Sequence, residues 1–452
     1  MSFKLKPVTQ HLLLAGFISL SPLAAQAADN DAEDRIKKLE QQVNILLQRL
    51  ETQQVSLNEQ KQVIEQNSKK TENAVIAKTN GRSLKFESAD GDFVAQVGGR
   101  VQADAAFYDG DIPSGDGTDF RRIFLDLRGQ VYKDWAYRFQ YDFARPNGNT
   151  STRGIRDAYI KYTGLDAGNI TVGQFKSPFG LEHLTSSLHS TFLERGLNHV
   201  FTPDRRIGIG FDTKGDNWTF AVAGLGGTAE DEDNSSVNKD EGWNLVGRVT
   251  ATPFKSDKGL LHIGLAARQN WAGDTDSTVR FRERPEVRVD GSRLIDTGSI
   301  SNVDEQRSYG VELAGVYGPF SLQAEYTTTD IERDTGSDLD FDSWYAYASY
   351  FLTGESRTYK NGIFDRTKVK KAVGKGGYGA WEVAARYSTA DLTDGTVIGG
   401  ELDNATFGVN WYATNNVRFA ANYIKVLDID RPSNALDGKD GDIFAARAQI
   451  DF

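Results

Sequence analysis

Residues 93–107 read FVAQVGGRVQADAAF, and the alternation in this stretch decides the fold. Apolar side chains occupy every second position at both ends of the stretch, and the polar residues between them are Gln96, Arg100, Gln102 and Asp104. Successive side chains of a β-strand point to opposite faces, so the stretch predicts a strand with one apolar and one polar face. The same alternation recurs at residues 135–143, 243–249, 261–268 and 417–423.

About sixteen such strands are expected, most of them near the ~10 residues that a tilted membrane-spanning strand needs. Their predicted starts lie near residues 92, 120, 134, 154, 169, 206, 217, 243, 260, 307, 319, 342, 378, 404, 415 and 442. Tight turns alternate with long polar loops, which are expected around residues 177–205, 225–241, 271–306 and 388–403. This alternation is typical of outer-membrane barrels, and only the connection at about 354–377 is long on the predicted short side.

The C-terminal stretch FAARAQIDF, residues 444–452, places Phe444, Ala446, Ala448, Ile450 and Phe452 on one face of the last strand. A water-soluble antiparallel sheet would also alternate, but it needs no aromatic-rich outer face. In lipid every backbone polar group must be paired, so the sheet must close on itself. The sequence therefore predicts an all-β, sixteen-stranded antiparallel transmembrane β-barrel around a water-filled lumen, over residues 83–452.

The N-terminal part of the sequence lacks the two-residue alternation of the strands. Residues 1–27 combine two lysines, an apolar run and a small-residue end, which predicts a secretory signal peptide. Residues 28–75 are expected to form a periplasmic coiled coil, because a seven-residue period places apolar or amide side chains at Ile36, Leu39, Val43, Leu46, Leu50, Gln53, Leu57, Gln60, Ile64 and Asn67. A solitary amphipathic helix is the alternative. The period does not choose between two strands and three.

The composition gives no support for an enzyme or a metalloprotein. The chain has no cysteine, and its five histidines lack the spacing of metal ligands. Its glycine clusters lie at strand ends, without the helix that a phosphate-cradling loop requires. No serine has an evident histidine or aspartate partner. We therefore expect no catalytic residues, no cofactor and no nucleic-acid partner.

Residues 279–288, VRFRERPEVR, gather arginines in a chain whose formal net charge is −11. In an extended backbone Arg280, Arg282 and Arg284 project to one side, about 6.6 Å apart. Guanidinium groups match carboxylate and phosphate oxygens, so together with Arg288 they could line a path for anions. The alternative is an exposed loop in which Glu283 and Glu286 pair with these arginines.

Several motifs resemble the family of phosphate-selective porins O and P over nearly all of residues 83–452. They are VGGRVQAD (97–104), FRRIFLDLRG (120–129), VGQFKSPFGLE (172–182), LERGL (193–197), AEY (324–326), LTGESRTYK (352–360) and GVNWYATNNVRFAANYIKV (408–426). The resemblance implies a homotrimeric outer-membrane porin of a Gram-negative bacterium, whose third loop folds inward from about residue 176 as a constriction. It implies an arginine ladder at Arg280, Arg282, Arg284 and Arg288, a constriction pair at Arg121 and Arg122, and lumen positions for Arg100 and Arg195.

This sequence departs from the phosphate-specific members of that family. Arg156 stands where they have a central acidic residue, His183 replaces a lysine of their binding site, and Lys176 adds a charge that they lack. Their lysine cluster after AEY is replaced by Thr327, Thr328, Thr329, Asp330, Glu332 and Asp334. The expected function is an anion-selective channel for phosphate or polyphosphate. The alternative is a general diffusion porin without phosphate specificity, which also tethers the envelope through contact of its coiled coil with the cell wall.

Overall fold

The computed structural model describes residues 28–72, 74–79, 81, 83–144, 154–229, 241–273 and 277–452. The predicted signal peptide, residues 1–27, lies outside this described part. The chain divides into two units, residues 1–74 and 75–452. We describe each unit by itself.

The first unit contains helix α1 (Ala28–Glu72), which confirms the helix expected from the heptads. Its 45 residues correspond to a length of about 68 Å at 1.5 Å per residue. The apolar heptad positions face solvent in the single chain, and they are Ile36, Leu39, Val43, Leu46, Leu50, Leu57 and Ile64. A coiled coil needs further chains to cover this seam, so it stays a prediction. Among the described helices, none is both long and apolar enough to span a membrane.

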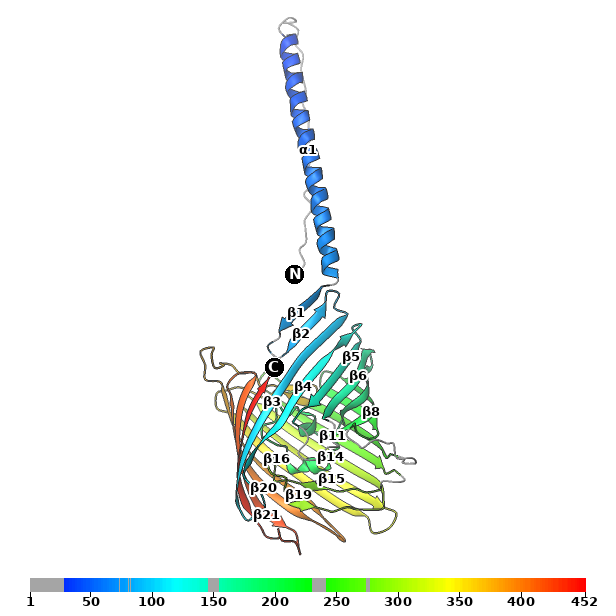
Figure 1. The fold of residues 1–452 in the computed structure, drawn as a ribbon, viewed down its shortest axis with the longest axis vertical. Helices are drawn as coiled ribbons and strands as arrows, with labels where there is room; N and C mark the ends of the chain where they lie inside the picture. Colours follow the sequence, from blue (N-terminus) through cyan, green and yellow to red (C-terminus); the bar gives the residue numbers. More distant parts are fainter. Residues whose placement is uncertain are drawn as a thin grey trace. The chain divides into compact units, whose positions relative to one another are not determined.

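The second unit is a closed antiparallel barrel, as predicted (Figure 1). Within the described residues the barrel has sixteen strands: β3 (Phe93–Gly110), β4 (Gly117–Val131), β5 (Trp135–Asp142), β6 (Ile155–Leu165), β7 (Gly168–Lys176), β8 (Arg205–Lys214), β9 (Trp218–Leu225), β10 (Trp243–Lys255), β11 (Gly259–Trp271), β14 (Val303–Tyr317), β15 (Phe320–Arg333), β16 (Leu339–Phe351), β19 (Ala380–Asp394), β20 (Val397–Tyr412), β21 (Val417–Asp430) and β22 (Gly441–Asp451). The last strand pairs with the first, from Gly441 opposite Gly110 to Asp451 opposite Arg100.

Shorter elements accompany the barrel. Strands β1 (Val75–Thr79) and β2 (Leu84–Ser88) pair with each other, and β2 extends the sheet at the start of β3. The connections contain α2 (Leu181–Leu184), the 3₁₀ helix η1 (Leu197–Phe201), and two small hairpins. The hairpins are β12 (Arg282–Glu283) with β13 (Ile295–Asp296), and β17 (Thr358–Lys360) with β18 (Ile363–Asp365).

The barrel reverses the pattern of a soluble protein. On β3 the polar Gln102 and Asp104 are buried, whereas Phe107 is 56% exposed. Similarly, Asn422 is buried on β21 while Phe419 on the opposite face is exposed. Exposed apolar side chains are stable in hydrocarbon, and the buried polar face then borders the lumen. The alternation seen in the sequence therefore separates a lipid face from a lumen face.

Two glycines allow the barrel to close. A Cβ atom on Gly98 would lie 2.7 Å from the carbonyl oxygen of Phe452, and one on Gly99 would lie 2.8 Å from the Phe452 ring. The Gly99 amide donates to the Phe452 carbonyl at 2.8 Å, and the Phe452 amide donates back to Gly99 at 3.0 Å. The VGGR motif thus brings the C-terminal residue against the first strand because neither glycine has a side chain.

An apolar cluster packs two connections against the buried face of the barrel. It contains Leu193, Leu197 and Phe201 from the β7–β8 connection, and Phe281, Val287, Leu294 and Ile295 from the β11–β14 connection. The barrel contributes inward apolar residues to the same cluster, including Ile331, Phe341, Leu392, Leu402, Ile424 and Val426. Burial of apolar surface contributes a free energy of roughly 25 cal/mol per Å², and this stabilises the two connections against the barrel.

Fifteen of the sixteen predicted strand starts agree with the structure within four residues, but the strand predicted to start near 404 begins at Val397, and one predicted loop is wrong. The long loop expected around residues 388–403 is two strands, since β19 runs to Asp394 and β20 begins at Val397. Asp391, Glu401 and Asp403 lie in these extended strands, and their charge made the segment look like a loop. The connection at 354–377, long on the predicted short side, contains the β17–β18 hairpin.

Candidate functional site

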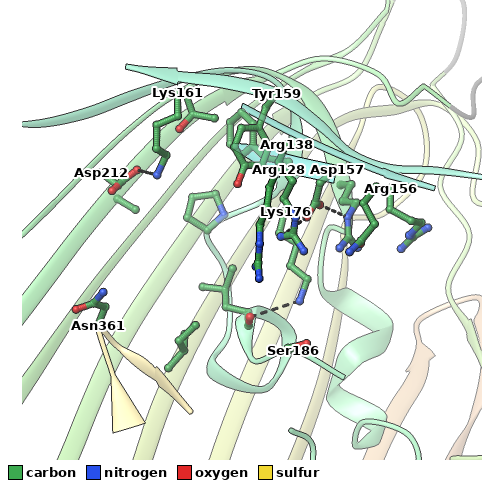
Figure 2. Close-up of a pocket in the computed structure, with 18 of the residues that line it drawn as sticks. Arg128, Arg138, Arg156, Asp157, Tyr159, Lys161, Lys176, Ser186, Asp212 and Asn361 are labelled. Carbon is green, nitrogen blue, oxygen red and sulfur yellow. Dashed lines mark hydrogen bonds and ion pairs between the residues drawn. The ribbon is translucent and has the colours of Figure 1, made fainter. Parts of the chain in front are cut away.

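A cavity of about 780 Å³ lies among the polar side chains of the barrel. Figure 2 shows Arg128, Arg138 and Lys176 among the residues that border it. Its basic lining residues are Arg100, Arg122, Arg128, Arg138, Arg156, Lys161, Lys176, Arg195, Arg205, Lys214, Arg248 and Arg366, and its acidic ones are Asp126, Asp157, Asp212, Asp365 and Asp451. The wall therefore carries an excess of positive charge.

Part of this charge is arranged as a chain of ion pairs along one wall. Arg138 contacts Asp126 and, at 2.7 Å, Asp157. Asp157 accepts a 2.5 Å bond from Arg205, which also contacts Asp204 at 3.3 Å. Asp204 in turn pairs with Arg156 at 2.7 Å. Three carboxylates thus alternate with three guanidinium groups, so the positive and negative charges along this wall nearly cancel.

Other cations on the wall are bonded to uncharged atoms. Lys176, at the end of β7, donates its Nζ to the backbone carbonyls of His183, Leu184 and Thr185. Arg195 donates to the carbonyls of Glu182 at 3.0 Å and His183 at 3.1 Å. A carbonyl dipole orients a cation without cancelling its charge. These contacts are not ion pairs, so they orient the two side chains without a bonded carboxylate.

Arg100 is also hydrogen-bonded to an uncharged group. Its Nη1 donates to the Ser187 hydroxyl at 2.9 Å, and its guanidinium lies 4.0 Å from the centre of the Phe124 ring. Ser187 belongs to the β7–β8 connection, residues 177–204. The same connection accepts bonds from Arg418 through Ser190 and Thr191, and from Arg447 through Leu193. Strands distant in sequence thus hold this connection against their buried faces.

The predicted constriction pair has a counter-ion that the sequence did not reveal. Arg121 donates to both carboxylate oxygens of Glu194, at 2.8 and 3.0 Å. Arg122 lies 3.7 Å from the same carboxylate, and it donates to Gln102 at 2.9 Å. Burial alone would raise the pKa of Glu194, but Arg121, Arg122 and Arg447 outweigh burial and hold that pKa well below its usual range. Glu194 is therefore a permanent negative charge beside the pair.

The arginines of residues 279–288 lie on the β11–β14 connection, outside the 780 Å³ cavity. Arg280 pairs through Nε with Asp296 at 2.7 Å, and Arg284 donates to the Asp290 carbonyl at 3.3 Å. Arg282 is exposed, and Arg288 lies 3.9 Å from Glu194. Burial and then the charges of Arg293 and Arg288 lower the pKa of Arg284 to about 10, so it stays charged at neutral pH.

The alternative pairing expected for this segment is not the one observed. Glu283 lies 3.6 Å from Arg293, and Glu286 is bonded to Arg386, Ser388 and Thr406 on the barrel wall. Because Glu286 is 4% exposed, it anchors the segment instead of neutralising its arginines. The structure therefore does not show the expected side-chain pairing of Glu283 and Glu286 with these arginines, and the arginine ladder stays a prediction.

His183, which replaces the family lysine, is buried and stacks on His199 with ring centres 5.5 Å apart. Burial, and next the charges of Lys176 and Arg195, lowers the pKa of His183 well below its usual range. Burial and Arg195 do the same to His199. Both rings are therefore neutral at physiological pH and add no charge to the wall. In the described residues no group of three acidic, histidine or cysteine side chains could hold a metal ion.

The cavity unites five of the predicted residues: Arg100, Arg122, Arg156, Lys176 and Arg195. Sequence reasoning did not select Arg138, Arg205, Arg248 or Arg366, which also line it. A usable signal existed for Arg138 and Arg248, because both stand on the polar face of an alternating strand. Arg366 lies in the long turn at 354–377, where no periodic pattern marks it.

Comparison with known proteins finds a porin family and individual proteins that are similar to this chain. The family model "Phosphate-selective porin O and P" matches residues 95–452. Porin O of Pseudomonas aeruginosa is 30% identical over 416 residues, which cover 84% of this chain and 92% of that protein. An uncharacterised protein of Caulobacter vibrioides is 30% identical over 390 residues, covering 82% and 76%. An anion-selective porin from Comamonas acidovorans is 15% identical with a TM-score of 0.48, covering 80% of this chain and all of that one.

Proposed function

The chain belongs to the family of phosphate-selective porins O and P, and from this membership we propose that it is an anion-selective outer-membrane channel that passes phosphate-class anions, including polyphosphate. The observation that carries the proposal is the excess of arginine and lysine around the 780 Å³ cavity. Sixteen strands enclose more space than side chains can fill, so the barrel leaves an aqueous path. The positive wall then lowers the free energy of anions in that path and raises that of cations.

The arrangement of the charges supports passage instead of capture. Lys176, Arg195 and Arg100 attract anions because their bonded partners are uncharged. The ion pairs along the Arg138–Asp157–Arg205 wall contribute little net field. Several modest attractive sites in sequence let an ion enter and leave, whereas one very strong site would retain it. In this proposal Arg280, Arg282, Arg284 and Arg288 guide anions toward the channel, and Arg121, Arg122 and Arg156 act in its interior.

A second candidate is a general anion porin without phosphate specificity, and two observations favour it. The residues after AEY include Asp330 and Asp334, which repel a multiply charged anion. The neutral His183 supplies no charge where the resemblance implies a lysine. Under both candidates we propose a homotrimer with α1 as a periplasmic coiled coil. In the second candidate this coiled coil also tethers the envelope through contact with the cell wall.

A planar bilayer experiment tests the channel proposal. In a potassium chloride gradient the purified protein should give a reversal potential of the sign expected for chloride, because fixed cations face the lumen. Titration with inorganic phosphate should then reduce the chloride current at low concentration if phosphate binds specifically. An unblocked chloride current would favour the general anion porin, and a current carried chiefly by potassium would refute both.

Removing the ladder charges should weaken this selectivity. Replacing Arg280, Arg282 and Arg284 together with alanine is expected to lower the chloride-to-potassium permeability ratio about threefold, because solvent screens the attraction that exposed charges exert on anions. The ratio follows from reversal potentials. Arg280→Ala alone leaves Asp296 unpaired, so the matched R280A/D296A variant should lose less selectivity than R280A. Unchanged reversal potentials in the triple variant would exclude these arginines from the path.

A further inference from the structure

Glu194 is the meeting point of four guanidinium groups from separate parts of the chain. Its carboxylate accepts bonds from Arg121 at 2.8 and 3.0 Å and from Arg447 at 2.8 Å. Arg122 and Arg288 approach it to 3.7 and 3.9 Å. These arginines come from β4, from β22 and from the β11–β14 connection. The side chain of Glu194 is 11% exposed, so the carboxylate is largely enclosed by them.

The arginines around Glu194 are oriented by bonds of their own. Arg447 forms a two-point contact with Asp104, with both distances 2.7 Å, and donates to the Leu193 carbonyl at 2.6 Å. Arg122 is held by Gln102 at 2.9 Å. Four guanidinium groups thus face two carboxylates, Glu194 and Asp104, and the group keeps a positive balance. Removal of the Glu194 charge would leave a preorganised cluster of donors.

Such a cluster matches a permeating oxyanion. Carboxylate and phosphate oxygens accept the same paired N–H donors from arginine, so they compete for the same positions. Arg122 also lines the 780 Å³ cavity, which connects the cluster with the proposed anion path. Because Glu194 is covalently attached, it competes at an effective concentration on the order of millimolar or higher.

We infer that Glu194 is a tethered competitor that occupies an oxyanion-binding site formed by Arg121, Arg122, Arg288 and Arg447. The inference rests on the proposed function and deepens it. A phosphate-class anion in transit shares or displaces the arginine contacts of Glu194, and the carboxylate then returns to them as the anion leaves. The internal carboxylate keeps the site from retaining the ion that it attracts, which is the condition for conduction.

The test measures phosphate block of single-channel chloride current for the full-length protein and for Glu194→Gln. Glutamine has nearly the same shape but no charge, so E194Q should lower the phosphate concentration that halves the current by at least about tenfold. Glu332→Gln is the matched control. Glu332 pairs with one arginine, Arg307, at 2.8 Å. The E332Q substitution therefore removes the same negative charge as E194Q, but at a position outside the arginine cluster. E332Q should shift the half-blocking concentration less than about twofold.

Glu194→Asp keeps the inference testable if E194Q fails to assemble. The shorter side chain retains the charge but cannot span the same arginines, so its half-blocking concentration should lie between those of the wild type and E194Q. Equal half-blocking concentrations in wild type and E194D, or in wild type and E194Q, would overturn the inference while an anion-selective wild type leaves the proposed function standing. An equal shift in E332Q would also overturn it, because the effect would then be one of overall charge. A potassium-selective wild type would instead refute the proposed function itself.

Discussion

Replacing Arg386 with methionine should lower the free energy of unfolding by about 3–5 kcal/mol, the cost of removing one partner of a buried ion pair. Arg386 has a fully buried side chain on β19. It contacts Glu286 at 2.5 Å and Glu182 at 3.6 Å, and it donates to the Glu194 carbonyl at 3.1 Å. One guanidinium therefore joins the β7–β8 connection and the β11–β14 connection to the barrel wall.

Methionine fills a similar volume but leaves Glu286 and Glu182 without their cation in a buried region. The two connections should then loosen, so single-channel conductance should rise as stability falls. Urea unfolding followed by tryptophan fluorescence in detergent measures the first effect, and planar bilayers measure the second.

Two variants calibrate the result for Arg386. Arg307→Met removes an arginine that is 41% exposed and paired with Glu305 and Glu332, so it should destabilise the protein far less than R386M does. The double variant R386M/E286Q removes both charges of the main pair, so it should be more stable than R386M alone. If R386M cost no more than R307M, or if the double variant were less stable than R386M, the proposed anchoring role of Arg386 would be wrong.

The barrel could be predicted from the sequence because the pattern that encodes it lies within each strand. Lipid on one side and water on the other impose a two-residue period, which is visible in residues 93–107 without knowledge of any partner. The heptads of α1 predicted a helix for the same reason. The predicted loop at 388–403 failed because β19 and β20 continue through a segment rich in acidic residues, where the usual apolar outer face is lost.

The candidate site was only partly predictable, because ion pairing depends on contacts between distant residues. Arg121 and Glu194 are 73 residues apart, and Arg447 and Glu194 are 253 apart. No periodic pattern links such positions, so arginines could be selected by motif while their counter-ions could not. Inward apolar residues such as Ile424 and Val426 weaken the strand pattern in the sequence, yet they mark where the connections pack.

The coiled coil gives the prediction with the largest expected effect on association. A peptide of residues 28–72 should be helical and oligomeric at micromolar concentration, because the single chain leaves its heptad seam in water. Leu46 and Leu50 are 57% and 58% exposed in the single helix. Burial of each leucine contributes roughly 1.5–3 kcal/mol per chain. Replacing both with aspartate should therefore weaken association at least about a thousandfold.

Sedimentation velocity would report the size of the peptide oligomer, and circular dichroism would report its helicity. The matched control replaces Gln41 and Gln48 with aspartate, because both residues lie on the helix face opposite the seam and the variant carries the same added charge. That control should remain helical and associated, whereas L46D/L50D should be monomeric and largely unfolded, since an isolated helix in water lacks the packing that stabilises it. A wild-type peptide that stays monomeric at these concentrations would show that α1 does not form the coiled coil by itself. Equal weakening by both variants would mean that charge, and not the apolar seam, controls association.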